Sequence, residues 1–139
     1  MVHLATHGIL EEQAPLFSAL LTGHARGQSS RVNLYEIAGL RLKNRLIVLS
    51  ACETGLGRLR GGDEITGLTR VFLEAGASAV ISSLWKVSDD STALLMAEFY
   101  RELKRGRREP EALRTASLAV RQKFPHPFYW APFILTGGR

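Results

Sequence analysis

The chain has 139 residues, of which 45% are hydrophobic and 22% are charged. This length is enough for one domain with a single hydrophobic core and too short for two, and the composition is typical of a soluble globular protein. The sequence has no apolar run of about 20 residues, the length that spans a bilayer, and no signal-peptide pattern. It has a single cysteine, which cannot form an intrachain disulfide. These features predict a cytoplasmic protein without a membrane contact.

The formal net charge of +5 makes a nucleic-acid partner a function class to weigh. Much of the excess lies near the end of one expected helix and along the next, at Arg101, Lys104, Arg105, Arg107, Arg108, Arg114, Arg121 and Lys123. Cations near a helix C-terminus interact favourably with its dipole, and no aromatic side chains interleave with this cluster to stack bases. We therefore expect a solvated basic face, and nucleic acid is an unlikely partner.

Apolar runs and amphipathic segments alternate along the chain. Strands are predicted at residues 2–6, 16–21, 46–49, 79–84 and 133–135. Helices are predicted from Asn33 to 38, from Asp63 to Gly76, from the polar run at 88–91 to about 103, and from Pro110 to about 123. Loops are expected at 24–31 and 55–62, and Pro125 and Pro127 end the last helix.

This alternation predicts an α/β domain with a mainly parallel sheet. The segment 46–49 (LIVL) is apolar on both faces, as a central parallel strand should be. In such sheets, ligands and reactive groups lie beyond the carboxyl ends of the strands. His7, Cys52 and the pair Asp89 and Asp90 all follow predicted strands and should meet at that edge.

Cys52 follows the strongest predicted strand and precedes a glycine-rich segment. One interpretation is that its thiol only completes the packing of the strand, since free cysteine is among the most buried residue types. The other is chemical, because an imidazole at the end of a second strand, His7, could remove the thiol proton and leave a nucleophilic thiolate.

Three sequence blocks carry a family resemblance: residues 4–8 (LATHG), 48–55 (VLSACETG) and 83–89 (SLWKVSD). Further matches are FY at 99–100, ALR at 112–114 and PFYWAPF at 127–133. Together they resemble the CHAT family of caspase-like peptidase domains, which is related to separases and often attached to TPR repeats. The resemblance implies a three-layer α/β/α fold over 1–139, as a single partial domain with N-terminal strands missing.

The resemblance also implies roles for individual residues. His7 would be the catalytic imidazole and Cys52 the nucleophile, acting on a protein or peptide substrate through a thioester acyl-enzyme. The backbone N–H groups of Gly8 and Cys52 would form the oxyanion hole. Asp89, or alternatively Asp90, would line the S1 pocket and select a basic P1 residue, although both carboxylates could instead cap the following helix. No cofactor is expected.

The other histidines, His3, His24 and His126, show no metal-ligand spacing, and His3 is expected to be structural and to point away from the site. Trp85 and Trp130 are expected in the core or in pocket walls.

Two other functions remain open. The segment Cys52 to Arg58 fits C-x5-R, the loop of a cysteine-dependent phosphatase. The chain could also be an inactive or partner-dependent pseudo-peptidase that acts as a scaffold. Because the missing strands would leave the 2–6 edge unpaired, we expect a homo-oligomer or a separately encoded partner such as a TPR protein.

Overall fold

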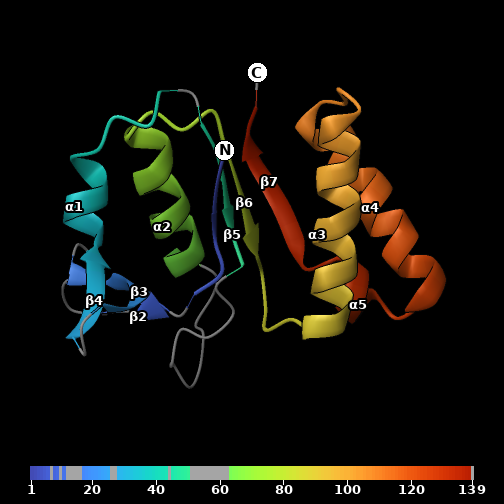
Figure 1. Ribbon diagram of the computed structural model, residues 1–139, viewed down its shortest axis with the longest axis horizontal. Helices are drawn as coiled ribbons and strands as arrows, with labels where there is room; N and C mark the ends of the chain where they lie inside the picture. The colour runs from blue at the N-terminus through green and yellow to red at the C-terminus, as the bar shows by residue number, and fades with distance from the viewer. Residues whose placement is uncertain are drawn as a thin grey trace.

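The computed structural model describes residues 1–6, 8–9, 11, 17–25, 28–43, 45–50 and 63–138, with 24–25, 28–30 and 63–66 described by backbone alone. Its main sheet has the order β1-β5-β6-β7 (Figure 1). These strands span Val2–Leu4, Leu46–Leu49, Ala79–Ser83 and Phe133–Gly137. β1, β5 and β6 run parallel to one another, and β7 pairs with β6 in the antiparallel direction.

The two central strands carry the apolar residues of the sheet. Every residue of β5 and β6 is buried, and Ile47, Val48, Val80 and Ile81 have no exposed surface. Parallel strands covered on both faces require such continuous apolar runs. The strands predicted at 46–49 and 79–84 are confirmed, and so is the mainly parallel sheet.

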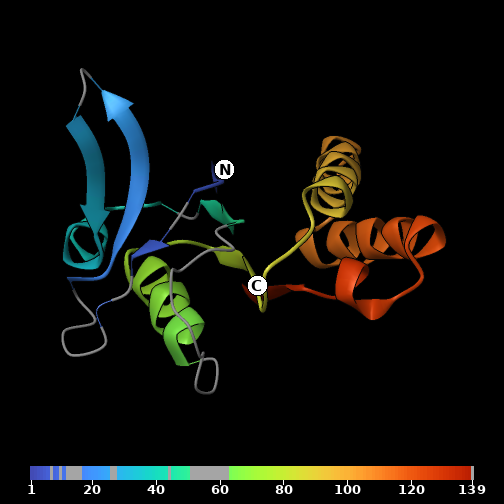
Figure 2. The same ribbon diagram turned by 90° about the horizontal axis from the view of Figure 1, so that it is seen from below.

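Helices cover both faces of the sheet. α1 (Leu34–Ala38) and α2 (Asp63–Glu74) lie on one face, and α3 (Asp89–Lys104), α4 (Glu109–Lys123) and the short α5 (Pro127–Trp130) lie on the other (Figures 1 and 2). Each face has its own buried cluster, with Phe72 against Ile47 and Val80 on the first, and Phe99 against Val48 and Ile81 on the second. This is the α/β/α layering that the family resemblance implies.

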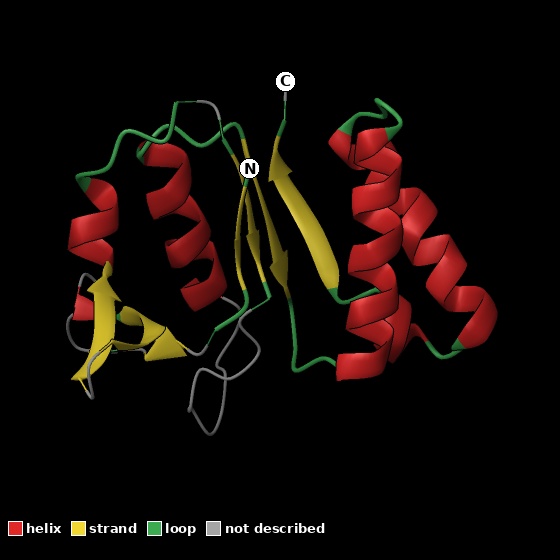
Figure 3. Ribbon diagram, viewed as in Figure 1, coloured by secondary structure: helices red, strands yellow, loops and turns green. Residues whose placement is uncertain are grey.

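A second, antiparallel sheet corrects part of the prediction (Figure 3). β2 (Gly8–Ile9), β3 (Ala19–Ala25) and β4 (Gln28–Asn33) form it, in sequence order. The loop expected at 24–31 is wrong, and the strand expected at 16–21 begins and ends later. Most residues at the end of β3 (TGHA) and in β4 (QSSRVN) are polar or glycine, so the pairing of these strands with one another, and not apolar alternation, defines them. The short helix α5 was also not expected.

α1 begins where the sequence predicts, because Glu36 reaches back to the residue before the helix. Its carboxylate accepts hydrogen bonds from the backbone N–H and the side-chain amide of Asn33, at 2.8 and 2.9 Å. These bonds stabilise the ionised carboxylate and lower the pKa of Glu36. The N–H groups at a helix start lack partners within the helix, so this contact defines the boundary.

The helices α2 and α3 end in the same motif. Gly106, with φ of +83°, donates to the carbonyl of Leu103, and Arg107 donates to the carbonyl of Glu102. The equivalent bonds after α2 surround Gly76, with φ of +94°. This is the Schellman arrangement, which needs a left-handed residue just past the helix and therefore favours glycine.

Replacing Gly106 with alanine should reduce the free energy of unfolding by about 1 kcal/mol, because alanine is strained at this φ although nothing lies within 4 Å of the added methyl group. Gly67, inside α2, is the matched control because its added methyl group is equally free of contacts and its φ is not positive. Gly67→Ala should raise the unfolding free energy by about 0.5–1 kcal/mol. Urea denaturation followed by circular dichroism measures both, and equal signs for the two variants would contradict the assignment.

Carboxylates pair with four of the eight residues of the basic cluster. Glu102 is 3% exposed, and its carboxylate binds Arg105 and Arg107, each at 2.5 Å. Two further ion pairs join Arg101 to Glu98 and Arg108 to Glu111. These pairs close the connection between α3 and α4 and support the expected solvated face over a nucleic-acid site. In the described part of the chain, no helix has the length and apolar character needed to cross a bilayer.

Candidate functional site

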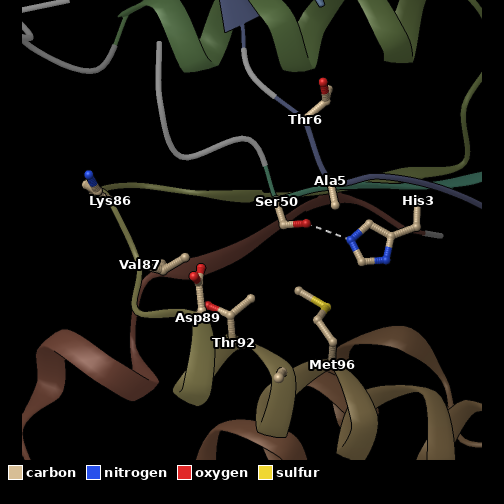
Figure 4. Close-up of a pocket in the computed structure, with 10 residues that line it drawn as sticks. His3, Ala5, Thr6, Ser50, Lys86, Val87, Asp89, Thr92 and Met96 are labelled. Atoms are coloured by element: carbon tan, nitrogen blue, oxygen red, sulfur yellow. Dashed lines mark hydrogen bonds between the residues drawn. The ribbon is translucent and has the colours of Figure 1, made fainter. Parts of the chain in front are cut away.

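A cleft of about 570 Å³ opens at the carboxyl edge of the parallel strands, between the main sheet and the start of α3. Figure 4 shows side chains from four segments around it. Those that follow or belong to strands are His3, Ala5, Thr6, Ser50, Lys86 and Val87, and those on α3 are Asp89, Thr92, Ala93 and Met96. The cleft therefore lies at the edge where the topology predicts a site.

The ends of β1 and β5 are tied together at this edge. The two strands are neighbours in register, with Leu4 opposite Leu49, and the N–H of Ser50 donates to the carbonyl of Leu4 at 3.1 Å. Just beyond, the Thr6 hydroxyl donates to the carbonyl of Leu21 on β3. The segments that leave β1 and β5 thus enter the cleft side by side, and the hydrogen bond of Thr6 fixes the segment after β1 to the second sheet.

A chain of hydrogen bonds forms one wall of the cleft. The Nε2 atom of His3 lies 2.6 Å from the Oγ of Ser50, and its Nδ1 lies 2.7 Å from the hydroxyl of Tyr100 on α3. The rings of His3 and Tyr100 are also in contact, with centroids 5.8 Å apart. Both nitrogens of one imidazole are therefore held by hydroxyl groups.

The expectation that His3 points away from the site is wrong. A strand has a period of two residues, so His3 and Ala5 face the same side, and both line the cleft. That period was the signal in the sequence that could have placed His3 here. Nothing local indicated Tyr100, which is 97 residues away in the chain.

Partial burial sets the protonation of this network. Burial lowers the pKa of His3 below its usual value, because the charged imidazolium loses water. Burial raises the pKa of Tyr100 for the same reason, since its charged form is the phenolate. At neutral pH both side chains are therefore neutral, and the wall carries no charge.

The two candidate S1 carboxylates differ in position. Asp89 lines the cleft, and its carboxylate points into it from the first turn of α3 (Figure 4). Asp90 is exposed in the same turn and does not line the cleft. The backbone of Ser88 is the helix cap, with its carbonyl accepting from the Ser91 hydroxyl at 3.1 Å. Of the two, Asp89 is therefore placed to contact a ligand.

His7 and Cys52 lie outside the described residues, as does the C-x5-R segment from Cys52 to Arg58. Gly8, the other expected oxyanion-hole residue, is buried in β2 opposite Leu20 of β3. Gly8 thus belongs to the small sheet that adjoins the cleft-lining segment after β1.

The two tryptophans lie outside the cleft lining. The indole N–H of Trp85 donates to the carbonyl of Phe128 at 3.0 Å, and its ring stacks on the Phe128 ring. The indole N–H of Trp130 donates to the carbonyl of Pro125 at 3.0 Å. Trp85 directly precedes Lys86, so its contacts with α5 anchor the segment that carries this lysine to the cleft. Within the described residues, no group of three or more His, Cys, Asp or Glu side chains could hold a metal ion.

The CHAT domain family model matches residues 1–138. Among curated proteins, the chain is 36% identical over 104 residues to tetratricopeptide repeat protein 28 of Mus musculus and 34% identical over 104 residues to the protein of that name from Homo sapiens. Each alignment covers 73% of this chain and 4% of the relative, so the chain corresponds to a small part of these relatives. The match over nearly all of the sequence, on the α/β fold described above, shows that the chain belongs to the CHAT domain family.

Proposed function

We propose that the chain is a cysteine endopeptidase domain in which Cys52 is the nucleophile and His7 is the base. Membership of a family related to caspase-like peptidases supports this reaction class. It does not favour the phosphatase alternative, which rests on the C-x5-R spacing alone. The remaining support comes from the geometry of the cleft.

The observation that carries the proposal is that Thr6 and Ser50 line the same cleft. Thr6 directly precedes His7, and Ser50 stands two residues before Cys52. Because β1 and β5 are hydrogen-bonded parallel neighbours, the chain leaves both strands at the same edge. A base and a nucleophile that follow these strands would be within reach of one substrate.

The proposed reaction has two halves. His7 takes the thiol proton of Cys52, and the thiolate attacks the peptide carbonyl carbon. The oxyanion is stabilised by the N–H groups of Gly8 and Cys52, each worth about 3–4 kcal/mol in the transition state. The C–N bond then breaks, His7 protonates the leaving amine, and water hydrolyses the thioester to release the acid and the free thiol.

The carboxylate of Asp89 supports a preference for a basic P1 residue. Asp89 and Lys86 are the charged side chains among the described residues that line the cleft. A long guanidinium or ammonium side chain that entered between the sheet and α3 would offer hydrogen-bond donors to Asp89, and a charge-assisted bond of this kind contributes about 1.5–3 kcal/mol.

Asp89→Asn should lower kcat/KM for peptides with Arg or Lys at P1 by about 10–100-fold, the loss of one charge-assisted hydrogen bond. Peptides with Gln or norleucine at P1 should be cleaved as by the wild type. Asp90→Asn is the matched control, because it makes the same chemical change in the same helical turn outside the cleft. Equal effects of the two variants would refute the S1 assignment. A wild-type chain that cleaves no peptide of the panel would refute the proposal that the isolated chain is a peptidase.

The relatives support a second proposal about partners. Both are named as tetratricopeptide repeat proteins, so we propose that this domain acts with a TPR segment, in the same polypeptide or in a separate chain. In the described residues β1 has a strand on one side only, which fits association with a second copy or a partner strand. If activity requires that partner, the isolated chain would behave as a pseudo-peptidase.

The cytoplasm remains our proposed compartment, because the only cysteine is the proposed nucleophile.

A further inference from the structure

His3 is held on both ring nitrogens by groups that can either donate or accept. Ser50 lies at Nε2 and Tyr100 at Nδ1, at 2.6 and 2.7 Å. A neutral imidazole has one N–H and one lone pair, so the ring must donate to one hydroxyl and accept from the other. The tautomer of His3 therefore decides the direction of both hydrogen bonds.

The direction of these bonds decides what Ser50 offers to the cleft. If the proton is on Nδ1, His3 donates to Tyr100 and accepts from Ser50, and the free lone pairs of the serine face the cleft. If the proton is on Nε2, His3 donates to Ser50, which then keeps only one free lone pair and has a hydroxyl proton that can point into the cleft. Protonated His3 donates from both nitrogens and has the same effect on Ser50 as the second state.

When a cation is bound, the other groups of the cleft favour the tautomer with the proton on Nδ1. Asp89 can only accept, and the buried hydroxyl oxygen of Thr92 has no hydrogen-bond partner among the described residues. Figure 4 shows Ser50 and Asp89 on opposite sides of the cleft, on the sheet and on α3. A guanidinium between them would need acceptors on both sides.

We propose that His3 determines specificity by keeping its proton on Nδ1, toward Tyr100, so that Ser50 accepts a hydrogen bond from a cationic side chain in the cleft. The inference rests on the proposed S1 role of the cleft and adds a residue pair that acts through Ser50. His3 and Tyr100 are positioning residues in this scheme, and Ser50 and Asp89 make the contacts.

The scheme couples cation binding to the loss of a proton by His3. Among the described residues, the titratable Tyr100 of α3 and the neutral Ser50 after β5 contact the ring, and the charged side chains that line the same cleft are Asp89 of α3 and Lys86 of the segment after β6. A protonated His3 would occupy one of the two lone pairs of Ser50 and would add a second positive charge opposite the ligand. The affinity for a cation should therefore be highest at pH values above the pKa of His3 and should fall as the pH drops through that pKa.

The coupling can be measured on the full chain carrying Cys52→Ala, with Nα-acetyl-arginine amide as the probe and its neutral isostere Nα-acetyl-citrulline amide as the reference. NMR on the imidazole of His3 gives its tautomer and its pKa with and without each probe. We expect the Nδ1–H tautomer in the arginine complex and a pKa that falls by about one unit on saturation, which corresponds to about tenfold weaker binding once His3 is protonated. Citrulline amide should bind with the same affinity at each pH.

Three variants separate this role from a structural one. His3→Gln should remove the pH dependence of arginine-amide binding in this range. Tyr100→Phe should reduce the preference for arginine over citrulline amide, because the ring loses the acceptor that holds its proton on Nδ1. His126→Asn, a change at a histidine that does not line the cleft, should leave the pH dependence intact.

The Nε2–H tautomer in the arginine complex, or an arginine affinity that does not vary with the protonation of His3, would overturn the inference. Equal affinity for arginine amide and citrulline amide would also overturn the inference. If the protein nevertheless cleaves peptides after other residues, the peptidase proposal stands. Conversely, coupled arginine binding in a chain that cleaves no peptide would support the cationic pocket and refute the proposal that the isolated chain is a peptidase.

Discussion

Cys52→Ala should abolish peptide cleavage, with a fall in kcat of at least about 10⁴-fold, because alanine provides no nucleophile to form the acyl-enzyme. His7→Ala should have a comparable effect, since without the base the thiol of Cys52 stays largely protonated at neutral pH. The double variant should be no worse than either single variant, because two residues that act as a unit are not additive. Initial rates on a peptide cleaved by the wild type measure all three.

Each variant must be shown to fold. Circular dichroism and thermal unfolding close to those of the wild type would assign the lost activity to chemistry. His126→Asn is a suitable histidine control, because His126 lies before α5, where its Nδ1 accepts from the backbone N–H of Phe128, and asparagine can replace it as a helix cap. A Cys52→Ala protein with wild-type turnover would exclude the proposed mechanism.

Phe99→Ala should reduce the free energy of unfolding by about 3–5 kcal/mol, the usual cost of truncating a fully buried aromatic side chain. Phe99 has no exposed surface and packs in the cluster between β5, β6 and the helices α3 and α4. The loss would be a large part of the about 5–15 kcal/mol that stabilises a typical domain. Urea denaturation gives the change from the shift in midpoint at constant slope.

A surface leucine provides the control for this prediction. Leu118 on α4 is 44% exposed, so Leu118→Ala should change the stability by no more than about 0.5 kcal/mol. If Phe99→Ala does not fold, Phe99→Leu leaves a smaller cavity and should still cost more than the control. A loss at Phe99 no larger than that at Leu118 would show that this cluster is not the core of the domain.

The sequence was most informative where a local pattern and the tertiary environment agree. The apolar run of β5 and the amphipathic pattern of α3 predicted these two elements, because burial on two faces or on one face leaves a clear pattern. Pro110 predicted the start of α4. Asn33 predicted the start of α1, and Gly76 the end of α2, because these residues satisfy backbone groups that a helix leaves unpaired. The hairpin of β3 and β4 was missed, because partner strands and not its own composition define it.

The cleft shows the same division. The sequence alone predicted the edge of the sheet at which the cleft lies, the family and the choice of two carboxylates, because the alternation of strands and helices and the motifs are local properties of the chain. Only the tertiary structure separated Asp89 from Asp90 and joined His3 to Ser50 and Tyr100. Those contacts connect residues 47 and 97 positions apart, and they exist because β1 pairs with β5 while α3 packs across the same face. No local sequence pattern specifies contacts between residues so far apart in the chain, since these contacts depend on the packing of the whole domain.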